Sequence, residues 1–351
     1  MTDSVRGKAK WRAAALATVL TALLWHAALP GRAAPKPEPV KPAERKTEEN
    51  GGDKGERGVA RSREPGAWGL PRNYRNEDGS FNQPAIVDQQ KKRLDEVNKR
   101  LIARMRLVET PHYLVFSDAD PAMTGLFVKW CEALYSNLCR HFAIGAEEKT
   151  WDGKCILVVF NSRAMYQQFA KTFDGSDVSR SGAYFAWEGQ PADQPQLVHI
   201  CIPLDTRDPR RLQELFAHEG THAFFQLYRK VVDLPLWLHE GLAEFMTVVN
   251  DKSLTAQKQQ WSTRMAQAGT SIRKILEVPT GQRFEYPAYS VSYTLVDFLL
   301  TAGKSKFKKF IDLVKDGKPQ EEALQEAYGF GLAELERRWY VFVLEYLPHR
   351  R

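Results

Sequence analysis

The spacing of apolar residues separates helical from extended segments along the chain. Residues 155–160 are apolar without interruption, which is typical of a central strand buried on both faces. Residues 86–105 instead carry apolar side chains at helical spacing, at Leu94, Val97, Leu101 and Met105. The first half of the chain therefore combines strands with amphipathic helices.

Residues 196–203 alternate in a way that predicts a strand with two distinct faces. One face carries Val198, Ile200 and Ile202, and the other carries Leu197, His199 and Cys201. Shorter extended segments are expected at 112–116 and 182–187. Helices are expected between the strands, one with Asp120 as its N-cap and a shorter one with Asn161 as its N-cap.

After residue 203 the pattern becomes helical. A helix is expected at 209–228, and a second begins near Pro235, with Asp233 as a possible cap. The strongest later helices are expected at 289–301, 304–315, 320–328 and 332–347. This order predicts an α+β protein in which a mixed sheet with helices precedes a helical lobe, with the active-site cleft between them.

The N-terminal part has the composition of an export signal and a linker. Basic residues precede an apolar run at 13–29, so residues 1–34 are expected to be a cleaved signal peptide or an uncleaved membrane anchor. Residues 35–66 are rich in Pro and charge and are expected to be disordered. The remaining chain is divided into a sheet-containing lobe at 67–250 and a helical lobe at 251–351. The protein is therefore expected to be exported: periplasmic, secreted or anchored at its N-terminus.

Charge and cysteine content limit the classes of partner. The net charge is +7, but the densest basic cluster, at 304–309, lacks interleaved aromatic residues, so no nucleic-acid partner is expected. Membrane contact is expected only through the possible anchor. The four cysteines match no zinc motif and are either disulfide-bonded or buried as small apolar groups; they are Cys131, Cys139, Cys155 and Cys201.

The most informative motif lies in the predicted helix 209–228. It contains His218, Glu219 and His222 in the order His-Glu-x-x-His. A helix turns once in about 3.6 residues, so both imidazoles lie on one face and can bind one metal ion. A catalytic zinc site has three protein ligands and keeps one position open. Glu219 is then the candidate general base toward water.

The segment 237–245 contains Trp-Leu-His-Glu-Gly, and here the sequence resembles the gluzincins. These are zinc peptidases whose third ligand is a glutamate in a Trp-Leu-x-Glu-Gly pattern. The resemblance implies one zinc ion, with Glu240 as its third protein ligand. It also implies that Glu244, one turn later, hydrogen-bonds a ligand imidazole, which would fix the orientation of that ring.

His239 is the rival to Glu240 as third ligand. The two side chains point about 100° apart on a helix, and only Glu240 shares its face with Glu244. Another large class of such enzymes places a third histidine six residues after the pair, where this chain has Tyr228. Gly220, inside the motif helix, costs about 1 kcal/mol relative to alanine. Close packing and room for the site are both open explanations for that glycine.

Two further segments carry resemblances that bear on catalysis. Residues 289–296 are similar to a helix start in related peptidases, which implies Tyr289, or else Tyr293, as donor to the developing oxyanion; an ordinary buried aromatic is the open alternative. Residues 196–203 match the edge strand that pairs with substrate. That match implies substrate binding along Val198, His199 and Ile200, with a plain structural strand as the alternative.

The segment Gly-Ala-Tyr at 182–184 resembles a turn and strand of exported bacterial proteins with a peptidase-MA-like domain of unknown function. The resemblance covers about residues 107–347 and implies a zincin-like fold. The expected function is a zinc-dependent peptidase, an endopeptidase in type, acting on a peptide or protein substrate. The alternative is a non-catalytic, envelope-tethered binding protein that retains a metal site.

Overall fold

The computed structural model describes residues 60–62 and 74–349, apart from 103, 146–147, 149, 189–196, 230–231, 281 and 283. The predicted signal or anchor at 1–34 and most of the predicted linker lie outside these residues. The described residues belong to one compact unit, Lys54–Arg351. No helix within the described ranges combines the length and the hydrophobicity that a membrane span needs.

Six strands within the described residues form one mixed sheet in the order β1-β5-β6-β4-β3-β2. Strands β3, β4 and β6 are parallel to one another, whereas β2 and β5 run antiparallel to their neighbours β3 and β6. The bounds are β1 Ala60–Ser62, β2 Arg106–Glu109, β3 Tyr113–Ser117, β4 Cys155–Phe160, β5 Tyr184–Glu188 and β6 Val198–Pro203. The predicted central strand is confirmed, because β4 has a parallel partner on each side and every one of its residues is buried.

The position of β6 corrects one prediction. Its alternating faces are confirmed, but β6 lies inside the sheet, with β4 on one side and β5 on the other. Its backbone groups are therefore used in pairing with these strands. The prediction that a substrate backbone pairs with an exposed edge at Val198, His199 and Ile200 is therefore wrong.

Strand β1 is a second difference from the sequence prediction. Its residues, Ala60–Ser62, fall within the segment 35–66 that was expected to be disordered. They pair in parallel with residues 186–188 of β5, which would otherwise be the edge of the sheet. An edge strand offers unpaired backbone groups, and a passing segment can use them even without an apolar pattern of its own.

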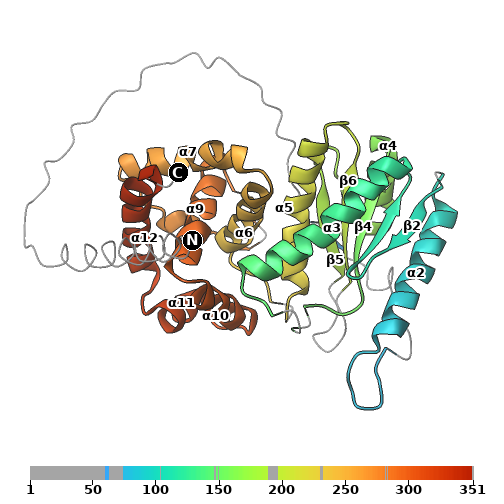
Figure 1. The fold of residues 1–351 in the computed structure, drawn as a ribbon, viewed down its shortest axis with the longest axis horizontal. Helices are drawn as coiled ribbons and strands as arrows, with labels where there is room; N and C mark the ends of the chain where they lie inside the picture. The colour runs from blue at the N-terminus through green and yellow to red at the C-terminus, as the bar shows by residue number, and fades with distance from the viewer. Residues whose placement is uncertain are drawn as a thin grey trace, which may run out of the picture. The chain divides into compact units, whose positions relative to one another are not determined.

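Helices cover both faces of the sheet (Figure 1). The predicted cap is confirmed at α3, where Asp120 accepts a hydrogen bond from the Met123 backbone. Asn161 does not cap α4, since Ser162 precedes that helix; its own backbone N–H instead donates to Asp118. The bounds are α2 Gln83–Arg100, α3 Pro121–His141, α4 Arg163–Phe169 and the π-helical turn η2 Ala170–Asp174.

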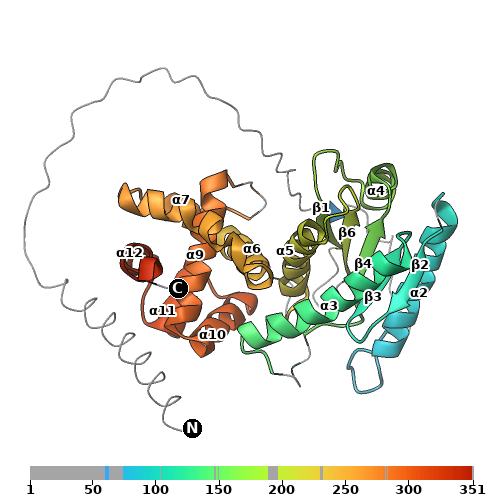
Figure 2. The same ribbon diagram turned by 45° about the horizontal axis from the view of Figure 1, so that its top comes forward.

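The two motif helices follow the sheet. Helix α5, Pro209–Leu227, packs on β5 and β6, and α6, Leu236–Asn250, packs on α5. Accordingly, α5 lies between the sheet and α6 in both views (Figure 2). Pro235 precedes α6 and no side chain caps it, so the predicted cap at Asp233 is wrong.

The C-terminal part is helical as predicted. The sequence gives the bounds of α10 and α11 correctly and those of α9 to within three residues at each end. The bounds are η3 Lys252–Leu254, α7 Thr255–Gln267, α8 Arg273–Leu276, α9 Tyr286–Ala302, α10 Lys304–Lys315, α11 Gln320–Tyr328, α12 Leu332–Val341, η4 Phe342–Tyr346 and η5 Leu347–His349. Helix α9 packs on α6 and α7, and so joins this part to the motif helices.

Two hydrophobic clusters lie on opposite faces of the sheet. The larger one contains the α5 face of the strands and continues into the C-terminal helices, and the smaller one lies under α2, α4 and η2. The α+β class is therefore confirmed. The boundary between lobes at residue 250 and the cleft between them stay predictions.

All four cysteines are free, so the disulfide alternative is wrong. Cys155 of β4 and Cys201 of β6 lie on neighbouring strands but on opposite faces of the sheet. Cys155 belongs to the larger hydrophobic cluster and Cys201 to the smaller one. Burial raises the pKa of each of the four thiols.

Candidate metal centre

The His pair of α5 and a glutamate of α6 converge on one point. Nε2 of His218 lies 3.0 Å from Nε2 of His222. Oε2 of Glu240 lies 3.5 Å from the first of these nitrogens and 3.6 Å from the second. The three residues are all buried, and each offers one ligand atom to the same small space. The structure therefore brings together the three side chains that the sequence proposed as ligands.

The chemistry of this trio fits a divalent metal ion. Two imidazole nitrogens that approach to 3.0 Å need a shared cation or a shared proton between them. Oε2 of Glu240 is buried and accepts no hydrogen bond from any residue the structure describes. Two nitrogens and one carboxylate oxygen are a donor set typical of a zinc site that keeps a position open. The residues present therefore fit zinc.

Glu219, the candidate general base, is a buried residue of the motif helix. It lies on α5 between the two histidines and is 2% exposed. Its place in the sequence next to His218 puts it on the same turn of the helix as the first ligand.

Glu244 lies on the expected side of His218 but does not hydrogen-bond it. Its Oε1 lies 3.6 Å from Nδ1 of His218, which is beyond hydrogen-bonding distance. Its Oε2 forms an ion pair with Lys258 of α7, whose ammonium also lies 3.9 Å from Glu214 of α5. Lys258 is 8% exposed, so this contact is shielded from solvent. Sequence reasoning missed Lys258, because no motif marks it.

His239 stacks beside the trio instead of joining it. Its ring centroid lies 4.1 Å from that of His222, and the edge of its ring meets Phe185 of β5. Phe185 also stacks on His222, with the centroids 5.4 Å apart. Burial, with the nearby His222, lowers the pKa of His239 well below its ordinary value. This ring therefore lines the site beside His222, and strand β5 borders the site through Phe185.

The two candidate tyrosines lie one turn apart on α9. Tyr289 is half-buried and packs edge-to-face on Phe284. Tyr293 is 3% exposed and packs on Phe245 of α6. The greater exposure of Tyr289 favours it as the residue that can reach a substrate. The role of either tyrosine toward an oxyanion stays a prediction.

Two glycines set how closely the motif helices pack. A Cβ atom at Gly220 would lie 2.5 Å from a methyl group of Leu134 on α3. At Gly241, next to Glu240, it would lie 2.4 Å from the backbone oxygen of Ser292 on α9. Close packing of α5 on α3 therefore explains Gly220, and Gly241 brings α6 against α9.

A buried lysine holds the connection between the two motif helices. Nζ of Lys315 in α10 donates hydrogen bonds to the backbone oxygens of Phe225, at 2.8 Å, and Val232, at 2.9 Å. It thereby binds the last turn of α5 and the segment that leads to α6. Burial lowers the pKa of Lys315 to about 7. The C-terminal helices thus help to fix the relative position of the ligands.

The family comparison agrees with this geometry. Residues 187–345, which include both motif helices, match the model of the Peptidase MA superfamily. No curated protein sequence matches the chain.

Part of the chain matches solved structures of zinc metallopeptidases. The M1 zinc metallopeptidase from Deinococcus radiodurans is 16% identical, and the match covers 68% of this chain and 51% of that one, with a TM-score of 0.35. A mutant of that enzyme is also 16% identical, and the match covers 69% of this chain and 52% of the mutant chain, with a TM-score of 0.35. A two-domain M1 zinc metallopeptidase mutant bound to L-arginine is 16% identical, with 68% and 51% covered and a TM-score of 0.36.

This chain spans about half the length of the solved structures that it matches. The family match covers the helices that carry the His pair and the Trp-Leu-x-Glu-Gly pattern. Residues 187–345 of this chain are therefore similar to the Peptidase MA superfamily, in line with the resemblance noted in the sequence.

Proposed function

We propose that the protein is an exported zinc-dependent peptidase, an endopeptidase in type, that hydrolyses peptide bonds in a peptide or protein substrate. The observation that carries the proposal is the convergence of His218, His222 and Glu240 on one point. The match to the Peptidase MA superfamily supports the same reaction class. The three residues would hold the ion, with Glu219 as the base.

A zinc ion bound by two neutral imidazoles and one carboxylate gives a site charge of about +1, and supplies Lewis-acid chemistry that activates water and polarises the scissile carbonyl. The carboxylate of Glu219 accepts a proton from the attacking water as its oxygen bonds to the carbonyl carbon. Glu219 then donates that proton to the leaving amine as the carbon–nitrogen bond breaks. The hydroxyl of Tyr289 donates a hydrogen bond to the oxygen that develops negative charge.

The Glu219→Gln variant tests this mechanism. The amide has nearly the same shape but cannot accept the proton, so kcat/KM should fall by about 10²–10⁴-fold while zinc content stays at the wild-type level. The control is Glu322→Gln, an exposed helical glutamate on α11, which should change neither.

The assay uses a substrate identified for the wild-type protein in a peptide-library digest. A fully active Glu219→Gln variant would falsify the mechanism. Wild-type protein that binds zinc but cleaves nothing in a broad library would instead favour the binding-protein alternative.

A further inference from the structure

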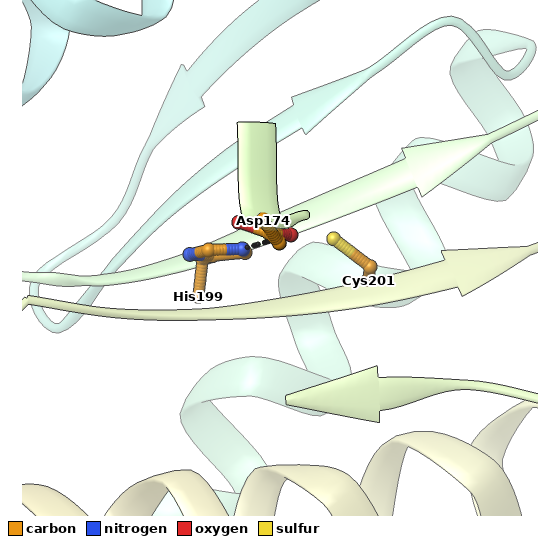
Figure 3. A group of neighbouring side chains, drawn as sticks. All are labelled: Asp174, His199 and Cys201. Atoms are coloured by element: carbon orange, nitrogen blue, oxygen red, sulfur yellow. Dashed lines mark hydrogen bonds and ion pairs between the residues drawn. The ribbon is translucent and has the colours of Figure 1, made fainter. Parts of the chain in front are cut away.

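A second group of metal-binding side chains lies on the opposite face of the sheet. Asp174 is the last residue of η2, and His199 and Cys201 stand two residues apart on one face of β6. Figure 3 shows the three side chains pointing toward one another. Their candidate ligand atoms, one oxygen, one nitrogen and one sulfur, lie within 4.8 Å of one another.

The carboxylate of Asp174 is the centre of this group. Its Oδ2 lies 3.0 Å from Nε2 of His199 and accepts a hydrogen bond of 2.6 Å from the hydroxyl of Tyr184. Tyr184 stands opposite Cys201 in the pairing of β5 with β6. A fourth oxygen donor therefore borders the same space.

The group is sealed from solvent. Asp174 is 4% exposed, His199 is 3% exposed, and Tyr184 and Cys201 are fully buried. The smaller hydrophobic cluster surrounds it. Oδ1 of Asp174 is buried and has no hydrogen-bond partner among the residues that the structure describes. A carboxylate in such surroundings needs compensation for its charge and for its unused oxygen.

A divalent ion provides that compensation. One carboxylate, one thiolate and one neutral imidazole contribute two negative charges, which balance the two positive charges of the ion. A neutral assembly is the least costly one to bury in an apolar cluster. A proton on His199 would balance the charge of Asp174. It would not explain why Cys201 points to the same place. The mixture of sulfur, nitrogen and oxygen donors favours zinc over magnesium or calcium.

We infer that Asp174, His199 and Cys201 bind a second divalent transition-metal ion, zinc by its donor set, with the hydroxyl of Tyr184 as the fourth donor. With its coordination filled by protein, the ion is structural. It fastens η2 to β5 and β6 from the face opposite the His218 trio. This inference stands on residues outside the proposed active site and does not depend on the proposed function.

Binding of the ion is a ligand exchange without redox change. The sulfur–hydrogen bond of Cys201 breaks, a sulfur–metal bond forms, and the proton passes to solvent. His199 would bind through Nε2 as the neutral ring, and Asp174 would bind as the carboxylate. Tyr184 keeps its proton, which stays hydrogen-bonded to Asp174.

Cobalt titration of the full chain tests the inference. The protein is stripped with a chelator and titrated with Co²⁺, which replaces zinc and gives an intense near-ultraviolet charge-transfer band when a thiolate binds it. The His218 trio contains no sulfur and cannot produce this band. We expect two equivalents of cobalt in the wild type, one of which gives the thiolate band.

Three variants assign the band. Cys201→Ala should lose the band and one equivalent of metal, whereas Cys139→Ala, which changes a partly exposed thiol elsewhere, should keep both. His222→Ala should lose one equivalent but keep the band. Zinc analysis of the purified proteins should give the same pattern, with two ions in the wild type and one each in Cys201→Ala and His222→Ala.

Wild-type protein without a thiolate band at saturating cobalt overturns the inference, and so does a band that survives Cys201→Ala. In either case the group is a hydrogen-bonded cluster that packs η2 on the sheet. Should Cys201→Ala fail to fold, the wild-type spectrum together with that of His222→Ala still decides.

Discussion

On the two sides of one sheet lie two groups of three candidate metal ligands, which differ in charge and surroundings. The His218, His222 and Glu240 group lies between two helices, beside a buried carboxylate at Glu219, and would carry a charge of about +1 with a divalent ion. The group of Asp174 lies in an apolar cluster and would be neutral. A site that keeps a positive charge next to a base is suited to catalysis. A neutral site whose coordination positions are all filled by protein is suited to a structural role.

The largest expected effect is on peptidase activity, which should depend on the His218 group and not on the Asp174 group. His222→Ala removes one ligand of the first group, so kcat/KM should fall by roughly 10³-fold or more, because the ion contributes several kcal/mol to stabilisation of the transition state. Cys201→Ala should leave kcat/KM within a few-fold of wild type while lowering the melting temperature. Parallel peptidase assays and thermal melts measure both. Loss of activity in Cys201→Ala without loss of folded protein would break the division of roles.

The next effect concerns the oxyanion donor. Tyr289→Phe removes a hydroxyl that interacts only in the transition state, so kcat should fall by about 10²–10³-fold with little change in KM. Tyr293→Phe is the matched control one turn away on α9 and should stay near wild type. Steady-state kinetics of both variants test this. The reverse ranking would assign the role to Tyr293.

A series of glycine variants measures how much the first group depends on close helix packing. Gly241→Ala places a methyl group against the backbone oxygen of Ser292, which cannot move easily, and should cost about 1–3 kcal/mol of folding free energy. Gly220→Ala meets only side-chain atoms, a methyl group of Leu134 at 2.5 Å and the ring of Phe216 at 3.6 Å, and should cost less. The control is Gly125→Ala on α3, which meets nothing within 4 Å and should stabilise the protein by about 1 kcal/mol. Urea denaturation gives the order, and equal values for all three would contradict the packing explanation.

The smallest effect concerns Lys258. Lys258→Met keeps the apolar stem but removes the partner of Glu244, so the carboxylate beside His218 is no longer held in place. Zinc affinity should weaken by about 10–100-fold, as is typical when support of a metal ligand is lost. Lys252→Met, an exposed lysine at η3, is the control. Competition with a zinc indicator measures both, and unchanged affinity in Lys258→Met would show that Glu244 needs no such support.

The sequence predicts the first group well because its geometry is mostly local. Two histidines four apart on a helix must share a face, and Glu240 is chosen over His239 by the direction of its side chain on the next helix. The same locality explains why β4 and the helices α10 and α11 are found at their correct bounds. Their patterns are determined by the surfaces that they bury.

Other features depend on contacts between distant segments, and no local pattern contains them. The alternation of β6 gives its two faces but not its neighbours, so its place inside the sheet was missed. The partner of Glu244 is Lys258 on α7, fixed only when α7 and α9 pack together. Asp174 reaches His199 across 25 residues from a π-helical turn that the sequence did not predict.

Crystallographic measurement of the anomalous signal at the zinc absorption edge tests the first metal centre most directly. The predicted result is a peak at about 2.0–2.2 Å from Nε2 of His218, Nε2 of His222 and a carboxylate oxygen of Glu240, with no fourth protein ligand. Absence of a peak between the two rings in zinc-loaded crystals would contradict this site. A peak bound by both histidines with Glu240 turned away would contradict the proposed ligand set.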